Sequence, residues 1–192
     1  MTEAPGTVFL TKETRLRIAI FTTIILVLGL GTFGCRRDSA KPSKSAAVSG
    51  IKAFKKGDFK TAVSELEQAA KADPKNAKTR WMLGQSYEAL GRLNKAAGAY
   101  RESLKRNPKQ PDVLYKLGVV YKAQGRTGEA IEQLEKAVSV NPKAVGARLM
   151  LGDMYAAQGQ KAKAAAEYQA VIDMRPFGVD LKAVKAKLDG VK

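Results

Sequence analysis

The side chains that could do chemistry in this 192-residue chain are few, and their spacing favours binding over catalysis. The chain has no histidine and one cysteine, Cys35, so it lacks a histidine-activated nucleophile and an imidazole or cysteine-rich metal site. Carboxylates such as Glu88, Asp112 and Asp153 recur on faces that we expect to be solvated, and no glycine-rich phosphate loop or nucleophile elbow is present. We therefore expect no enzymatic activity, no cofactor, no metal and no small-molecule ligand.

The chain is strongly basic, with 34 lysines and arginines against 18 acidic residues and a net charge of +16. Such a field raises the rate of encounter with anionic partners and supports non-specific binding to nucleic acid. The cations are scattered along the chain rather than gathered in one stripe. A solvated basic surface beside anionic lipid headgroups accounts for this charge as well, so nucleic acid is not the partner that we expect.

An uncharged apolar run, IAIFTTIILVLGLGTF, covers residues 18–33. As a helix it would be about 24 Å long, a little less than the ~30 Å hydrocarbon core of a bilayer. We predict a transmembrane or signal segment over residues 18–35. It follows a basic N-terminal segment of cytoplasmic type, residues 1–17, and precedes a polar linker, residues 36–42.

Two membrane hypotheses remain open for this segment. In the first, it is an uncleaved signal-anchor helix; in the second, it is a lipoprotein signal and Cys35 becomes the lipidated N-terminus. Cys35 directly follows the apolar run with the small Gly34 before it, whereas Thr32 and Phe33 are a loose version of the usual box. Basic residues flank both ends, so the positive-inside rule gives little direction. An export-type leader favours a membrane-associated protein with its later residues outside the cytoplasm.

The rest of the chain repeats itself with a period of 34 residues. Four residue types keep this register through four copies, which predicts a repeat architecture with units 43–76, 77–110, 111–144 and 145–178. The residues in register are Gly50, Gly84, Gly118 and Gly152; Gly57, Gly91, Gly125 and Gly159; Ala62, Ala96, Ala130 and Ala164; and Pro74, Pro108, Pro142 and Pro176.

Each unit has the pattern of two helices. In the third unit the first helix ends before Gly125, which is free to adopt a left-handed conformation, and Asn141-Pro142 ends the second. Gly118 lies inside the first helix, where glycine costs about 1 kcal/mol relative to alanine. We expect it to allow close approach of the second helix, with the small Ala130 as its counterpart.

These motifs resemble the tetratricopeptide repeat (TPR) family. The family's first-helix motif of Leu-Gly followed by Tyr is present as Leu83-Gly84 with Tyr87, Leu117-Gly118 with Tyr121, and Leu151-Gly152 with Tyr155. The resemblance implies an all-α, right-handed superhelical solenoid of four helix-turn-helix units, preceded here by the N-terminal hydrophobic helix. Residues 179–192 place Leu181, Val184 and Leu188 on one helical face, as a C-terminal capping helix needs.

The resemblance also implies a binding groove lined by first helices. By register its residues are the second, fifth, ninth and twelfth of each unit, and the candidate binding residues are Lys78, Trp81, Gln85, Glu88, Asp112, Tyr115, Val119, Lys122, Leu149 and Asp153. Trp81 and Tyr115 are the expected anchors, because aromatic side chains dominate binding hot spots. Alternatively, Trp81 belongs to the core, since Arg80 occupies the place where the family often has tryptophan.

Some family members clamp a chaperone's terminal carboxylate with lysine and asparagine at fixed groove positions. This chain has Ala47, Ile51 and Met82 there, so we do not expect that role. The hypothesis is a membrane-tethered scaffold that binds a protein or peptide partner. The alternative is a repeat lipoprotein, lipidated at Cys35, that acts in secretion, pilus or envelope assembly.

Overall fold

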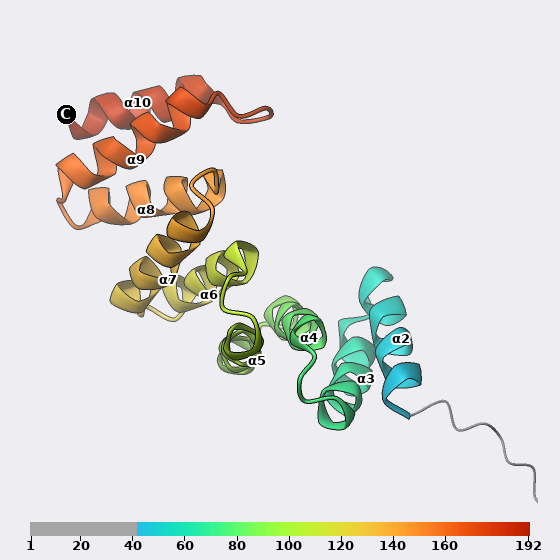
Figure 1. The fold of residues 1–192 in the computed structure, drawn as a ribbon. Helices are drawn as coiled ribbons and strands as arrows, with labels where there is room; N and C mark the ends of the chain where they lie inside the picture. Colours follow the sequence, from blue (N-terminus) through green and yellow to red (C-terminus); the bar gives the residue numbers. More distant parts are fainter. Residues whose placement is uncertain (1–41) are drawn as a thin grey trace, which may run out of the picture. The chain divides into compact units, whose positions relative to one another are not determined.

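The computed structural model describes residues 42–192, and within them every regular element is an α-helix (Figure 1). The predicted segments 1–17 and 18–35, with Cys35, and the linker up to residue 41 lie outside the described residues. In the described part no helix is long and apolar enough to cross a bilayer. The helices are α2 (Pro42–Lys55), α3 (Phe59–Ala72), α4 (Ala77–Ala89), α5 (Leu93–Arg106), α6 (Pro111–Ala123), α7 (Thr127–Val140), α8 (Val145–Ala157), α9 (Lys161–Met174) and α10 (Leu181–Val191).

The helices contact one another in chain order within the compact unit Ala40–Lys192. The first helix of each unit packs on its second, giving the pairs α2–α3, α4–α5, α6–α7 and α8–α9. Each second helix then packs on the first helix of the next unit, and α10 packs on α9. Stability should therefore arise from contacts within and between neighbouring units, as in other repeat proteins.

The turn between the two helices of a unit requires a left-handed residue. Gly125 has φ of +73°, and beyond it the Arg126 amide donates to the Tyr121 carbonyl at 2.9 Å, closing the end of α6. The prediction of a left-handed glycine after the first helix is thus confirmed. The same backbone conformation recurs at Gly57, Gly91 and Gly159.

The glycine inside each first helix marks the closest approach between paired helices. A Cβ atom placed on Gly84 would lie 2.5 Å from the ring of Tyr100, and one on Gly118 would lie 2.8 Å from Cγ of Leu134. Close packing was predicted, but the main counterpart of Gly118 is Leu134 rather than Ala130, which contributes its carbonyl oxygen at 3.3 Å. Residues four apart share a helix face, and the longer side chain reaches the glycine.

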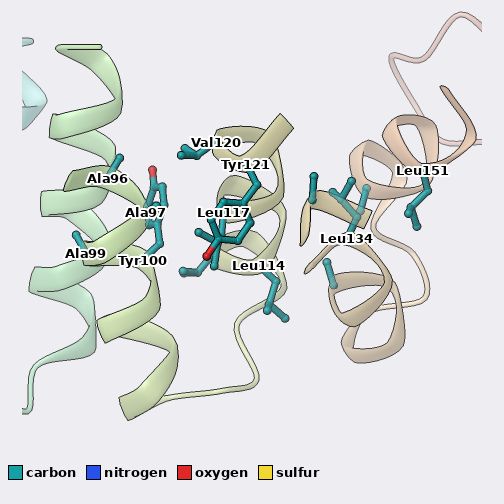
Figure 2. Packing of buried hydrophobic residues seen from close by; sticks show 14 of the residues in the cluster. Ala96, Ala97, Ala99, Tyr100, Leu114, Leu117, Val120, Tyr121, Leu134 and Leu151 are labelled. Atoms are coloured by element: carbon teal, nitrogen blue, oxygen red, sulfur yellow. The ribbon is translucent and has the colours of Figure 1, made fainter. Parts of the chain in front are cut away.

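One hydrophobic core runs through the whole stack (Figure 2). Tyr100, Leu117, Leu134 and Leu151 come from four consecutive helices and are almost fully buried between them. At the C-terminal end, α10 buries Val184 and Leu188 against this core and half-buries Leu181. The lysines of α10 are exposed, so this helix covers the last pair and presents a polar surface to water.

Replacing Gly84 by alanine should destabilise the fold by about 1–3 kcal/mol, because the added methyl group forces the buried Tyr100 ring to move. Gly98 in α5 is the matched control, since nothing lies within 4 Å of a Cβ atom there. Gly98→Ala should be neutral or stabilise by up to about 1 kcal/mol through helix propensity. Urea unfolding of residues 40–192 measures both changes, and equal effects would contradict this packing.

Candidate peptide-binding surface

The ten candidate binding residues all lie on first helices and none is fully buried. We call these ten residues the first-helix face. Its exposed members are Lys78, Asp112 and Lys122. Its half-buried members are Trp81, Gln85, Glu88, Tyr115, Val119, Leu149 and Asp153. Partial exposure leaves each of these side chains able to contact both the core and a partner.

The two expected anchors both pack on the protein while keeping part of their surface exposed. The half-buried Trp81 packs against the core cluster, and its buried indole Nε1 has no hydrogen-bond acceptor within residues 42–192. Tyr115 packs against the next first helix, where a Cβ atom on Gly146 would lie 3.4 Å from its Cζ atom. Trp81 therefore contacts the core, as the core alternative requires, and keeps part of its surface exposed, as the groove alternative requires.

Glu88 on α4 joins two successive units through hydrogen bonds. The hydroxyl of Tyr100 on α5 donates to Glu88 Oε2 at 2.6 Å, and Nζ of Lys116 on α6 donates to Glu88 Oε1 at 3.2 Å. Burial and the hydrogen bond to Glu88 strongly raise the pKa of the Tyr100 hydroxyl. The phenol therefore stays protonated and fixes the carboxylate in place.

Asp153 on α8 repeats this arrangement at the C-terminal end. The hydroxyl of Tyr168 on α9 and Nζ of Lys187 on α10 each donate to Asp153 Oδ1 at 2.7 Å. Partial burial alone would raise the pKa of the Asp153 carboxyl, but the hydrogen bonds from Lys187 and Tyr168 and the charges of Lys187 and Lys122 together lower it. This carboxylate attaches the terminal helix to the last repeat.

The candidate binding residues predicted from the sequence do not include the groups that hold Glu88 and Asp153 in place. These groups are Tyr100, Lys116, Tyr168 and Lys187. One signal could have found part of them: Lys187 follows Asp153 by one period of 34 residues, and Tyr100 and Tyr168 hold the same position in alternate units. Register alone does not say which of several nearby cations reaches a carboxylate. That selection depends on how adjacent helices pack.

Two hollows border the first-helix face at equivalent places in different units. The aromatic hollow has walls of Phe54 and Phe59, whose ring centroids lie 5.8 Å apart at 71°, and its other lining residues are Gln85, Glu88, Ala89 and Lys116. The second hollow is lined by Lys122, Thr127, Asp153, Met154, Ala157 and Gln158. Phe59 is absent from the candidate binding residues, because it lies at the start of the second helix α3.

The chemistry available on this face is recognition through apolar contact, hydrogen bonds and charge. The carboxylates of Glu88 and Asp153 are already engaged by phenol and ammonium groups. Within the described range of the chain, no group of three or more histidine, cysteine or acidic side chains could hold a metal ion.

Comparison with known proteins identifies the class. The family pattern described as tetratricopeptide repeat matches residues 49–111 and 115–179. Because these segments cover more than half of the chain, the protein belongs to the tetratricopeptide repeat family. TPR proteins act in general as scaffolds for protein–protein interaction. No curated protein sequence matches the chain.

Several solved structures share the fold. A crystal structure of MamA protein matches with 25% identity and a TM-score of 0.69, over 79% of this chain and 86% of that one. A tetratricopeptide repeat protein from Parabacteroides merdae matches with 19% identity and a TM-score of 0.72, over 79% of this chain and 60% of that one. The first TPR of Spaghetti (RPAP3), bound to an HSP90 peptide, matches with 19% identity and a TM-score of 0.58, over 62% and 95%.

Stability should fall at alkaline pH because the folded state raises tyrosine pKa values. Burial and the hydrogen bond to Glu67 raise the pKa of Tyr87 from 10.0 to about 12, and the pKa values of Tyr100, Tyr155 and Tyr168 rise further. A raised folded pKa contributes stability that is complete below the unfolded value and is lost as pH rises through the folded value. The free energy of unfolding of residues 40–192 should therefore decline above pH 10.

Phenolate absorbance provides the check on this cause. The native protein should ionise its tyrosines at higher pH than the urea-unfolded chain, and Tyr87→Phe should make the alkaline decline shallower. Coincident phenolate titrations of the native and unfolded chains would contradict the assignment.

Proposed function

We propose that this TPR protein is a non-enzymatic scaffold that binds a protein or peptide partner along its first-helix face. The observation that carries the proposal is a row of half-buried apolar side chains at one register on three successive first helices: Trp81, Tyr115 and Leu149. Each is packed against the core and so is held in place before binding. Fixed, partly exposed aromatic side chains give large contact area at a small cost in conformational entropy.

The aromatic hollow adds a subsite for an apolar side chain of the partner. Phe54 and Phe59 pack edge to face, and Glu88 and Lys116 lie beside them. This composition suits an apolar side chain flanked by polar backbone or side-chain groups. Small molecules and nucleic acid are not part of the proposal.

The ligand that we propose for this protein differs in chemistry from the HSP90 peptide bound in the Spaghetti structure. That TPR domain is bound to an HSP90 peptide. The positions at which family members hold such a peptide's terminal carboxylate are Ala47, Ile51 and Met82 in this chain. Methyl, butyl and thioether groups do not donate hydrogen bonds. The proposed partner segment is therefore recognised mainly through apolar side chains.

The double variant Trp81→Ala with Tyr115→Ala should lose about 2 kcal/mol of binding free energy, or roughly 30-fold in Kd. Peptides selected on residues 40–192 from a displayed random library serve as ligands, and Kd is measured by fluorescence anisotropy. Lys71→Ala, an exposed change on the second helix α3, is the matched control and should leave Kd unchanged. Selected peptides that bind the double variant equally well would defeat the groove assignment.

Thermal unfolding of the single variant separates the two roles of Trp81. Its half-buried ring should make Trp81→Ala destabilising by less than the about 3–5 kcal/mol of a fully buried tryptophan. A loss at or above that range would assign Trp81 to the core alone.

The proposed scaffold is membrane-associated through residues 18–35, with its repeats outside the cytoplasm. The uncharged run of residues 18–33 supports a signal-anchor helix, and the place of Cys35 after Gly34 supports the lipoprotein alternative in secretion, pilus or envelope assembly.

Intact mass of protein extracted from membranes distinguishes the two forms of attachment. The signal-anchor hypothesis expects an unmodified leader of residues 1–34. A chain that starts at Cys35 and carries added acyl mass would refute it in favour of the lipoprotein. Recovery of the full-length, unacylated chain would exclude the lipoprotein.

A further inference from the structure

The repeats allow one junction between units to be compared with its neighbours. In two junctions, the hydroxyl of the tyrosine that ends the Leu-Gly-Tyr motif donates a hydrogen bond to a glutamate on the preceding second helix. These pairs are Tyr87 with Glu67 and Tyr155 with Glu135. The middle junction has Tyr121 in the same position, but Arg101 occupies the position of the glutamate.

The middle junction therefore lacks the internal carboxylate that its neighbours possess. Among the side-chain hydrogen bonds of the described residues, Tyr121 has no counterpart to those of Tyr87 and Tyr155, although the Arg126 guanidinium lies over its ring, 4.3 Å from the centroid. Arg101 is exposed and forms no ion pair within residues 42–192. Hydrogen bonds from Arg126 to both carboxylate oxygens of Glu129 lower the pKa of that carboxyl, and the charge of Arg101 lies close enough to lower it further, but the ion pair of Glu129 is with Arg126.

A hollow opens at this place, which we call the second-helix hollow. Arg101, Leu104 and Lys105 of α5 line it together with Leu117 and Tyr121 of α6 and Gln133 of α7. Leucine side chains and the phenol ring make its floor apolar, while two cations lie at its rim. Lys105 is paired with the half-buried Glu102 at 2.6 Å, which leaves Arg101 as the cation available to a ligand.

We propose that the second-helix hollow binds an acidic side chain of a partner protein, together with an apolar residue next to it. The partner carboxylate takes the place that Glu67 and Glu135 hold in the flanking junctions. There it accepts a hydrogen bond from the Tyr121 hydroxyl and forms an ion pair with Arg101. The neighbouring apolar side chain lies on the half-buried Leu104, since Leu117 is almost fully covered by the core. This site is separate from the first-helix face and does not depend on it.

The cation and the apolar lining of the hollow together favour an acidic peptide over a simple anion. A carboxylate paired with a guanidinium and bonded to a phenol forms charge-assisted hydrogen bonds, which are stronger than neutral ones. Inorganic phosphate could use the cation but would leave the leucine floor uncovered. An acidic side chain with an apolar neighbour covers both parts of the hollow.

Fluorescence anisotropy of a labelled heptapeptide tests the proposal on the full-length chain in mild detergent. The probe has one glutamate between two leucines in a serine background, and the matched probe has glutamine instead of glutamate. The glutamate probe should bind about tenfold more tightly than the glutamine probe, and Arg101→Gln should remove that difference. Tyr121→Phe should weaken binding a few-fold while it keeps the ring in the core.

Matched variants distinguish this site from the first-helix face. Lys71→Gln removes an exposed cation from another second helix, and Tyr87→Phe removes a hydroxyl already bonded to Glu67, so both should leave Kd unchanged. The double variant Trp81→Ala with Tyr115→Ala should also leave it unchanged. Binding lost in that double variant but kept in Arg101→Gln would overturn the second-helix site without affecting the proposed groove.

Two further outcomes would overturn the proposal. One is the absence of any difference between the glutamate and glutamine probes. The other is displacement of the glutamate probe by inorganic phosphate, or by a short single-stranded DNA, at the probe's own concentration. Either anion would then suffice without an apolar neighbour.

Discussion

The contact between a first-helix glycine and a bulky side chain of its paired helix is the constraint on which this structure depends. At Gly84 and Gly152 the side chain is a tyrosine, and at Gly118 it is a leucine. Because no Cβ atom intervenes, the two helices approach closely and Tyr100, Leu134 and Tyr168 are almost fully buried. Dense packing of this kind fixes the geometry within each helical pair, and the pairs then stack on one another to share one continuous core.

Polar groups connect neighbouring units of this stack. The buried phenols of Tyr100 and Tyr168 reach carboxylates on the adjacent first helices, where lysines from the following helices also donate. A tyrosine buries a large apolar ring and keeps a hydroxyl that must find a partner. The same residues therefore serve the core and fix the charges along the first-helix face.

Equivalent positions hold different side chains from one unit to the next, and these differences can give each unit its own binding preference. The aromatic pair Phe54 and Phe59 borders the first units, whereas Lys122 and Asp153 border the last ones. In the middle junction, Arg101 replaces the glutamate of its neighbours. A scaffold of near-identical helix pairs can thus offer an ordered series of distinct contacts to one partner.

The 34-residue period by itself determined the helix pairs, the left-handed turn at Gly125 and the close packing at Gly118, because these depend on local backbone freedom and on side-chain size at fixed spacing. The resemblance to the tetratricopeptide repeat family, carried over in that register, assigned the candidate binding residues to first helices. Only the tertiary structure decided that Leu134 rather than Ala130 meets Gly118, that Lys187 reaches Asp153, and that Phe59 joins Phe54. These contacts depend on the distances and angles between packed helices, to which residues far apart in the chain contribute together.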